Sequence, residues 1–402
     1  MGLNVKVGLI GPLDMLKFKN MSKNRNKVID AAPASEISGS YAINDNAKAL
    51  HPDHLDLVIE DIDSYPECGG KTIRFASKDG QPLPYFRAGQ YLSLKLNIGE
   101  SFVTRPYSIC SSPKEALNGK MDVTVCENPD GFAADWILAR LQEGDEIVSS
   151  APEGTFYYEG LRDCKDVIAL AGGSGITPFL SMARAIRDGI EDFNLTIIYG
   201  SRTMERALFK NELAKISQEC PKVKVIYVLS DEQTEGYEHG FITGQLIKKY
   251  APDGEYSVFI CGPEAMYRFV SKEIDGLGLP RRLVRRELLG VSKKITENPD
   301  FPKECAGKEF KVTVHQGPKS HEITALADEP VLVALERAGI KAPSRCRSGE
   351  CGWCRSKLIS GEVFVPEENE GRRYSDIIHG YIHPCACFAI SDLEIEVPGE
   401  YL

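Results

Sequence analysis

Four cysteines in the C-terminal part of the chain have the side-chain type and the spacing of metal ligands. Cys346, Cys351 and Cys354 follow the pattern C-x4-C-x2-C, and Cys385 lies further along the chain. This spacing is typical of the thiolates that hold a [2Fe-2S] cluster. A redox-active C-x-x-C pair fits less well, because the residues after Cys354 alternate like a strand rather than a helix. Structural zinc prefers two closely spaced cysteine pairs, and it stays open as an alternative.

The residues between these cysteines favour a cluster. Gly349 and Gly352 permit left-handed backbone, which lets amide groups point at the sulfides. Arg345, Arg347 and Arg355 can offset the negative charge of the thiolates, and this would raise the reduction potential. The alternative reading is that these arginines are solvated surface side chains.

Two glycine-containing turns directly follow short apolar runs in the middle of the chain. The first is segment 172–178, Gly-Gly-Ser-Gly-Ile-Thr-Pro, which comes after the apolar run 167–171. A glycine-rich turn that leads into a helix presents backbone N–H groups and a positive helix end to a pyrophosphate. The second is segment 261–266, Cys-Gly-Pro-Glu-Ala-Met. Taken singly, each has a structural alternative, namely a tight turn without a ligand and a buried cysteine.

A third motif, Arg105-Pro106-Tyr107-Ser108, lies in a region of short strands. By itself, this motif is equally compatible with an arginine in an ion pair beside a tyrosine of the core. The three motifs together, in this order, resemble the ferredoxin-NADP reductase superfamily over about residues 56–290. The resemblance implies an oxidoreductase that binds a flavin in its first domain and a nicotinamide nucleotide in its second.

The resemblance also implies roles for single residues. In that family the arginine, here Arg105, meets a flavin phosphate, while Tyr107 and Ser108 contact the isoalloxazine side. Thr177 lies near the hydride-transfer contact and Cys261 lies beside the nicotinamide, so these two join Tyr107 and Ser108 as predicted catalytic residues. The predicted flavin contacts are Arg105, Pro106, Tyr107, Ser108, Gly131, Phe132 and Ala133. The predicted nucleotide contacts are Gly172, Gly173, Gly175, Thr177, Pro178, Ser201, Arg202, Asp231, Cys261, Gly262, Pro263 and Met266.

The second flavin phosphate site departs from the family pattern. The family has a helix start of the type G-x-x-S, whereas this chain has Gly131-Phe132-Ala133-Ala134. Ala134 lacks the hydroxyl, although backbone amides at a helix start still bind phosphate. FAD remains the expected flavin, with FMN as the open alternative.

The choice between NADH and NADPH rests on one position. NADPH-dependent members of plant type follow their third nucleotide strand with Ser-Arg, and this chain has Ser230-Asp231 there. An acidic side chain repels a 2′-phosphate and suits a ribose 2′-hydroxyl, which favours NADH. Arg202, after Ser201, and Arg206 are able to serve a 2′-phosphate instead, so NADPH stays open.

The C-terminal segment resembles a plant-type ferredoxin domain of β-grasp fold. In that family the fourth cluster ligand precedes a Ser-Asp pair by several residues. The pair Ser391-Asp392 selects Cys385 as this ligand and leaves Cys387 as a buried neighbouring thiol. The predicted metal ligands are therefore Cys346, Cys351, Cys354 and Cys385.

The rest of the sequence predicts the elements that position these motifs. Between 56 and 156, short alternating runs separated by glycine and proline predict an antiparallel β-barrel. Between 166 and 290, apolar runs alternate with helical segments, which predicts a doubly wound α/β domain. The expected parts of this multidomain chain are an N-terminal extension of unknown role (1–50), a flavin-binding β-barrel domain (51–160), an NAD(P)-binding domain (161–290), a linker (291–307) and a [2Fe-2S] ferredoxin domain (308–402).

Composition limits the partners and the compartment. A net charge of -10 argues against a nucleic-acid binder, which needs a basic face. The twelve cysteines show no disulfide-rich spacing, which favours a reducing, cytoplasmic compartment. The apolar run Val5–Leu16 contains Lys6, Pro12 and Asp14, so it is too short and too broken to cross a bilayer. A strand and a turn are expected there instead.

These features predict a reductase that passes electrons from NAD(P)H through a flavin to a [2Fe-2S] cluster. The cluster would then give single electrons to a partner protein, an oxygenase or another redox enzyme. Two alternatives stay open on the sequence. One is electron flow in the reverse direction, from a reduced partner to NAD+. The other is a non-enzymatic module in which the cysteines bind zinc and the domains scaffold a complex.

Overall fold

The structure is a computed structural model, and it describes residues 11–32, 41–128, 131–287 and 290–399. The chain divides into two compact units, Met1–Ala47 and Lys48–Leu402. The second unit contains every predicted site residue. No helix within the described ranges is both long enough and apolar enough to cross a membrane.

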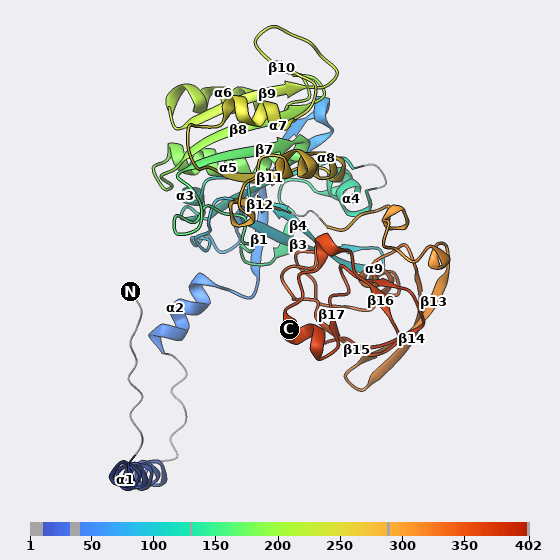
Figure 1. Cartoon of the computed structure of the whole chain (residues 1–402). Coiled ribbons are helices and arrows are strands. Elements are labelled where there is room, and N and C mark those ends of the chain that lie inside the picture. The colour runs from blue at the N-terminus through green and yellow to red at the C-terminus, as the bar shows by residue number, and fades with distance from the viewer. Residues whose placement is uncertain (1–10, 33–40, 129–130, 288–289, 400–402) are drawn as a thin grey trace. The chain divides into compact units, whose positions relative to one another are not determined.

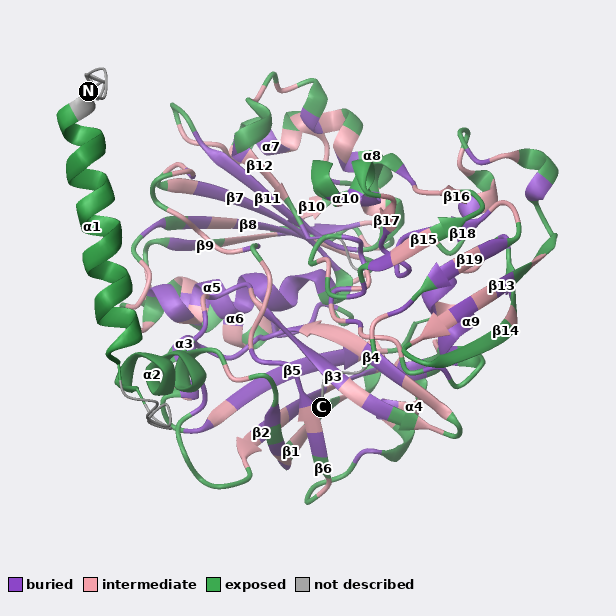
Figure 2. Ribbon diagram, turned by 90° about the horizontal axis from the view of Figure 1, so that it is seen from below, coloured by how far each residue is buried: buried purple, intermediate pink, exposed green. Residues whose placement is uncertain are grey.

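The first unit is helical where it is described. Helix α1 (Pro12–Asp30) carries exposed side chains throughout its described length (Figure 2), and helix α2 (Ala42–Leu50) follows it. The strand and turn expected over Val5–Leu16 are wrong from Pro12 onward, and the earlier part of that run lies outside the described residues. Pro12 stands in the first turn of α1, where a missing N–H costs nothing, so it starts a helix rather than a turn.

The second unit begins with a six-stranded antiparallel sheet in the order β4-β3-β6-β1-β2-β5, of which β1, β3 and β4 are labelled in Figure 1. An isolated bridge between Ile109 and Val123 joins the end of β4 to β5, which turns the sheet back toward a barrel. Its interior is filled by alternate apolar side chains such as Leu57, Phe75 and Leu92. The elements are β1 (Leu55–Tyr65), β2 (Gly70–Ser77), β3 (Tyr91–Ile98), β4 (Ser101–Ser108), α3 (Pro113–Ala116), β5 (Lys120–Cys126), α4 (Phe132–Arg140) and β6 (Glu146–Ser149).

A parallel sheet follows, in the order β10-β9-β8-β7-β11-β12. Alternate residues of β7 belong to different cores: Ala169 packs with side chains of α5 and α6, and Leu170 packs with side chains of α7 and α8. Helices therefore cover both faces. The elements are β7 (Asp166–Gly172), α5 (Thr177–Arg187), β8 (Asn194–Ser201), α6 (Lys210–Glu219), β9 (Val223–Leu229), β10 (Glu238–His239), α7 (Gly244–Tyr250), β11 (Ser257–Cys261), α8 (Glu264–Asp275) and β12 (Val284–Arg286).

The strand order of the parallel sheet reverses at β7. The chain runs from β7 to β8 on one side, and later returns to place β11 on the other side. Ligands of open α/β sheets bind at such a switch point, beyond the carboxyl ends of the strands. The segments that leave β7 and β11 there are the two glycine-containing turns of the sequence.

The C-terminal part has a mixed sheet in the order β14-β13-β19-β15-β17, with a small pair β16-β18. Only the pairing of β13 with β19 is parallel. Helix α9 packs Val331 and Leu335 against the sheet, as a β-grasp fold requires. The elements are β13 (Glu309–Gln316), β14 (Lys319–Leu326), α9 (Val331–Arg337), β15 (Ser356–Ser360), β16 (Val363–Phe364), α10 (Tyr374–Ile378), β17 (Tyr381–Ile382), β18 (Phe388–Ala389) and β19 (Leu393–Glu396).

The segment expected as a linker, 291–307, is packed. Ile295, Phe301 and Cys305 are buried in one apolar cluster with Phe388 of β18. Two short 3-10 turns, Ile295–Glu297 and Lys303–Cys305, compact its backbone. The connection between the second and third sheets is therefore held against the C-terminal domain.

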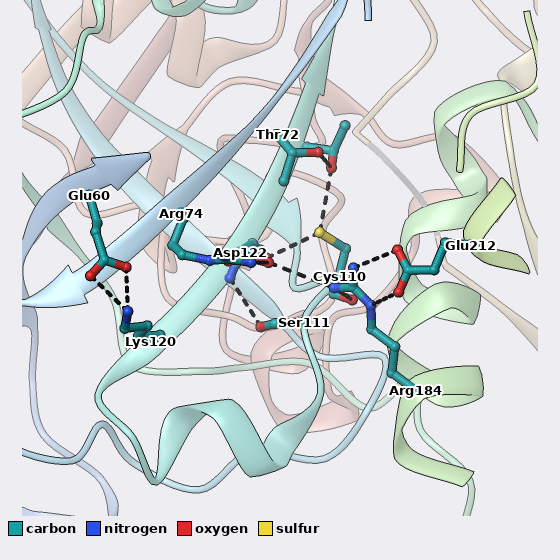
Figure 3. A network of polar contacts seen from close by, with 10 residues as sticks. Glu60, Thr72, Arg74, Cys110, Ser111, Lys120, Asp122, Arg184 and Glu212 are labelled. Carbon is teal, nitrogen blue, oxygen red and sulfur yellow. Dashed lines mark hydrogen bonds and ion pairs between the residues drawn. The ribbon is translucent and has the colours of Figure 1, made fainter. Parts of the chain in front are cut away.

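A buried ion network joins the barrel to the α/β domain (Figure 3). The carboxylate of Asp122, on β5, accepts two hydrogen bonds of 2.9 Å from Arg74 on β2. It also lies 3.7 Å from the guanidinium of Arg184 on α5, which in turn pairs with Glu212 on α6. Hydrogen bonding to Asp122 raises the pKa of Arg74. The carboxylate is 2% exposed, so both guanidiniums depend on it.

Removal of this carboxylate should destabilise the protein strongly. Asp122→Ala removes the buried counter-charge of Arg74 and leaves Arg184 with Glu212 alone, for which about 3–5 kcal/mol is the usual loss. Glu60→Ala is a matched control, because it removes the carboxylate of the half-exposed Lys120 pair and should change stability by less than about 1 kcal/mol. Denaturant unfolding of both variants measures the difference. Equal, small effects would show that the network adds little to stability.

Candidate functional site

The four predicted cluster ligands gather at one place in the C-terminal domain. Cys346 lies within hydrogen-bonding range of both Cys351 and Cys385. The sulfurs of Cys354 and Cys385 are 3.3 Å apart. Cys387 is instead fully buried in the core beneath the sheet. The geometry thus brings together the set that sequence reasoning selected.

The backbone around the sulfurs fits thiolates that bind a metal cluster. The N–H groups of Ser348 and Cys351 donate to Cys346 Sγ at 3.5 and 3.4 Å, and the N–H of Trp353 donates to Cys351 Sγ at 3.4 Å. Gly349 has φ +89°, and a Cβ there would lie 2.4 Å from the carbonyl oxygen of Asn369. The loop therefore needs glycine to aim its amides inward.

The arrangement differs from a site for one ion. Within the described ranges, no three Cys, His, Asp or Glu side chains surround a single point as one metal ion requires. A [2Fe-2S] cluster makes another demand, because its four thiolates are divided between two irons. The sulfurs form two neighbouring pairs, Cys346 with Cys351 and Cys354 with Cys385. These pairs and the amide donors around them fit a cluster of two irons.

The three arginines of the loop do not face the thiolates as free cations. Each pairs with a carboxylate, which reduces the charge that it offers to the thiolates. Arg355 is exposed, as the alternative reading expects, whereas Arg345 and Arg347 are largely buried. The pairs are Arg345 with Glu153, Arg347 with Glu336, and Arg355 with Asp376. Arg345 also stacks over the ring of Trp353.

The predicted flavin motif lies at the end of β4. Burial raises the pKa of the Tyr107 phenol to about 12, so its hydroxyl stays protonated and can donate a hydrogen bond. Ser108 is buried, and Pro106 lies opposite Ser93 of β3 on the edge strand β4, where a missing N–H is tolerated. Burial, and then the nearby Arg347, lower the pKa of Arg105 to about 10. Arg105 is therefore a charged, incompletely compensated guanidinium, and it fits an anionic phosphate.

The second predicted flavin phosphate site is a helix start. Gly131 caps α4, Phe132 and Ala133 form its first turn, and the first amides of the helix are free to meet an anion. Asp135 stands in the same turn, and a Cβ on Gly131 would lie 2.9 Å from its carboxylate. This carboxylate adds a negative charge to the same turn, which opposes the binding of a phosphate there.

The two glycine-containing turns pack backbone against backbone. A Cβ on Gly175 would lie 2.2 Å from the carbonyl oxygen of Cys261, and one on Gly172 would lie 2.5 Å from Met266 Sδ. Thr177 begins α5 and donates its hydroxyl to the carbonyl of Ser174 at 2.9 Å. Pro178 follows it in the first turn. The contact fixes both loops at the switch point of the sheet.

A cavity of about 1380 Å³ opens beside these turns, at the carboxyl ends of the parallel strands. The predicted nucleotide residues that line it are Gly172, Gly173, Ser201, Arg202, Pro263 and Met266. Those that lie outside its lining are Gly175, Thr177, Pro178, Asp231, Cys261 and Gly262. Asp231 accepts a hydrogen bond of 2.6 Å from the Ser230 hydroxyl, which itself lines the cavity. Side chains of α4, Asp135 and Leu138, border the same space.

Cys261 is fully buried beneath the cavity. Burial, and then the charge of Glu287, raise the pKa of its thiol well above the ordinary value. The thiol is therefore neutral near pH 7, which suits packing beside a ring rather than nucleophilic attack.

Comparison with known proteins places three family models on the chain in succession. They are an oxidoreductase FAD-binding domain over 71–158, an oxidoreductase NAD-binding domain over 169–272 and a 2Fe-2S iron-sulfur cluster binding domain over 314–390. The chain therefore has the three domains, in the order, that its resemblance to the ferredoxin-NADP reductase superfamily predicts. This reductase is a flavin and iron–sulfur oxidoreductase of three folded domains, with FAD, a nicotinamide nucleotide and a [2Fe-2S] cluster as cofactors. The predicted fold class and cofactor set are confirmed.

Several relatives share nearly the whole length of the reductase after its N-terminal extension. The glycine betaine monooxygenase reductase subunit of Chromohalobacter salexigens is 28% identical, covering 79% of this chain and 89% of that protein. The ferredoxin reductase component of the 3-ketosteroid-9-alpha-monooxygenase of Mycobacterium tuberculosis is 29% identical, covering 87% and 97%. Among solved structures, phthalate dioxygenase reductase is 26% identical with a TM-score of 0.60, covering 86% and 98%. That structure is described as modular, for electron transfer from pyridine nucleotides to [2Fe-2S].

Three residues of the reductase were missed by sequence reasoning. Phe241 and Phe269 line the cavity with their ring centroids 5.8 Å apart, although both are exposed. Glu287 follows β12, and its buried Oε2 has no hydrogen-bond partner among the described residues. A ligand that brings an N–H group there would satisfy it. Phe241 follows the carboxyl end of β10, a position that marks ligand contacts in such sheets.

Removal of either ring should weaken nucleotide binding. Base stacking on an aromatic ring is worth about 1–3 kcal/mol, so Phe241→Ala and Phe269→Ala should each raise the Kd for NAD+ about tenfold. Titration calorimetry with NAD+ measures the loss. The reduced mononucleotide NMNH lacks the adenosine half, and its oxidation should be unchanged.

Tyr374→Ala serves as the control for these variants. Tyr374 is an exposed ring on α10 and does not line the cavity. An equal effect on NAD+ binding and on NMNH oxidation would show that the rings do not contact the adenosine half of the nucleotide. An unchanged Kd for NAD+ in both phenylalanine variants would show the same.

Proposed function

We propose that this protein is the reductase component of an oxygenase system. It oxidises NADH, takes up the two electrons and releases them one at a time through the cluster domain to a partner oxygenase. The balance is one NADH and two oxidised acceptors, which give NAD+, a proton and two reduced acceptors. The relatives named as monooxygenase and dioxygenase reductases support this partner class.

The observation that carries the proposal is the contact between the cluster loop and the flavin strand. The hydroxyls of Thr104, on β4, and Ser344, two residues before the first cluster ligand, are 2.6 Å apart. Tyr91, at the start of β3, is buried, and its pKa is raised by burial and then by Cys346 and Cys351. The predicted flavin motif and the first two cluster ligands therefore face the same region. A carrier of two electrons and a carrier of one electron would lie next to each other there.

The protein's part in hydride transfer is placement. FAD supplies the redox chemistry once it is bound. The backbone of Gly172 and Gly173 would meet the pyrophosphate, and the neutral thiol of Cys261 would pack beside the nicotinamide. Tyr107 and Ser108 would hold the flavin edge by hydrogen bonds, and the positive charge of Arg105 would meet its phosphate. The domain boundaries expected from the sequence lie near 160, 290 and 307. They assign flavin binding, nucleotide binding and cluster binding to different domains.

The protein works in the cytoplasm under this proposal. None of the twelve cysteines forms a disulfide, although most are buried or half-buried within folded domains. A reducing compartment keeps such thiols free. It would also supply NADH to the cavity.

NADH is the proposed nucleotide because Asp231 stands at the sequence position where NADPH-dependent members of the resembling family carry an arginine. A relative in Escherichia coli, 27% identical, carries the name NADH oxidoreductase. Asp231→Arg should therefore raise kcat/KM for NADPH relative to NADH, by roughly tenfold for a new charge-assisted contact. Asp253→Arg, at an exposed position after α7, is the matched control and should leave the ratio unchanged. An unchanged ratio in both variants would assign the 2′ position to Arg202 and Arg206.

The cluster ligands are tested by a pair of serine variants. Cys385→Ser should abolish the cluster while leaving NADH oxidation by ferricyanide, which draws on the flavin. Cys387→Ser should keep the cluster, because this thiol is fully buried among the apolar side chains of the core. Iron content and the visible spectrum report the cluster. Loss of the cluster in Cys387→Ser alone would reassign the fourth ligand.

A further inference from the structure

An ion triad crosses the boundary between the flavin strand and the cluster domain. Glu336, on α9, binds Arg347 through both carboxylate oxygens, at 2.5 and 3.0 Å. Arg105, on β4, lies 3.9 Å from the same carboxylate. The Glu336 side chain is 6% exposed and that of Arg347 is 11% exposed, so the triad is shielded from solvent. Breaking such a buried group is costly, because it leaves an uncompensated charge.

The two arginines of the triad hold positions that matter for electron transfer. Arg105 opens the predicted flavin motif, and Arg347 directly follows Cys346, the first cluster ligand. Arg347 has φ +58°, a conformation that a residue with a side chain rarely adopts without support from its surroundings. The bidentate hold by Glu336 supplies that support. Glu336 thus fixes the backbone beside the cluster ligand.

Two further contacts join the same parts of the chain. Arg345 pairs with Glu153, which follows β6, and the hydroxyl of Ser344 meets that of Thr104. The segment from Ser344 to Arg347 is therefore attached to the barrel on both sides of Arg345. Of these contacts, the triad alone includes a residue of the predicted flavin motif.

We propose that Glu336 is a positioning residue for electron transfer from flavin to cluster, acting through Arg347 on Cys346 and through Arg105 on the flavin strand. The inference rests on the proposed function. The bound flavin and cluster would supply the redox chemistry, a transfer of one electron that would oxidise the flavin and reduce the cluster. No bond would be made or broken. The protein's share in the rate is therefore the distance and orientation at which it holds the two cofactors.

The geometry also explains how Arg105 serves two partners. Arg347 takes both oxygens of Glu336 at hydrogen-bond distance, and Arg105 stays further away. Arg105 uses one donor for the carbonyl of Thr104, which leaves other donors for a flavin phosphate. A carboxylate at this point balances the two guanidiniums, whereas a neutral amide does not.

The test is anaerobic stopped-flow reduction of the intact protein, loaded with FAD and cluster, by NADH. Glu336→Gln keeps the shape of the side chain and removes its charge. The rate of flavin reduction should stay within twofold of wild type, and the following reduction of the cluster should slow at least tenfold. Glu336→Asp keeps the charge and should recover part of the rate. Arg347→Lys, which keeps a charge without the two-pronged hold, should slow the same phase.

Glu329→Gln is the matched control. Glu329 forms an ion pair with Arg337 inside the cluster domain, away from the flavin strand, so the variant should show wild-type phases. A readout apart from electron transfer is hydrogen exchange of the apo-protein, in which the amides of 344–347 should exchange faster in Glu336→Gln than in Glu329→Gln.

The outcomes separate the two claims. If wild-type cluster is never reduced by NADH, the proposed function fails and this inference fails with it. If the wild type behaves as expected while Glu336→Gln reduces its cluster at the wild-type rate, only the positioning role is overturned. Slowing of flavin reduction and cluster reduction by the same factor would overturn it too, because the effect would then lie at the flavin.

Discussion

The contact between the cluster loop and strand β4 is the constraint on which the rest of the reductase depends. A two-electron donor and a one-electron acceptor exchange electrons only when they are held close together. The chain achieves this with Ser344 and Arg345, which bind Thr104 and Glu153 of the barrel, and with Glu336, which pairs with both Arg347 and Arg105. The packing of residues 291–307 against the C-terminal domain limits how far that domain is able to swing.

The nucleotide side of the molecule meets a different constraint. Hydride transfer needs the nicotinamide and the flavin face to face, so two loops must approach without side chains between them. Gly175 and Gly172 allow this approach at the point where the strand order of the parallel sheet reverses. The Asp122 network then fixes this domain against the barrel that carries the flavin motif.

The sequence contained enough to predict the three folds and most of the site. Motifs at the carboxyl ends of apolar runs are readable because parallel strands bring those ends together. Ion pairs between domains produce no recognisable pattern in the sequence. Glu336 and Arg105 are far apart in the sequence, and nothing periodic marks them as partners. The start of α1 was mistaken for a turn, because Pro12 is compatible with both until the residues after it are seen to form a helix.

The central claim is that electrons from NADH reach the cluster through the flavin of the same chain. Freeze-quenched electron paramagnetic resonance of the wild-type protein, mixed with NADH without oxygen, tests it most directly. The account predicts that the signal of a reduced [2Fe-2S] cluster grows after the flavin absorbance has been bleached. The account would be contradicted if NADH bleached the flavin but produced no signal of a reduced cluster, in a sample whose cluster is reduced by dithionite.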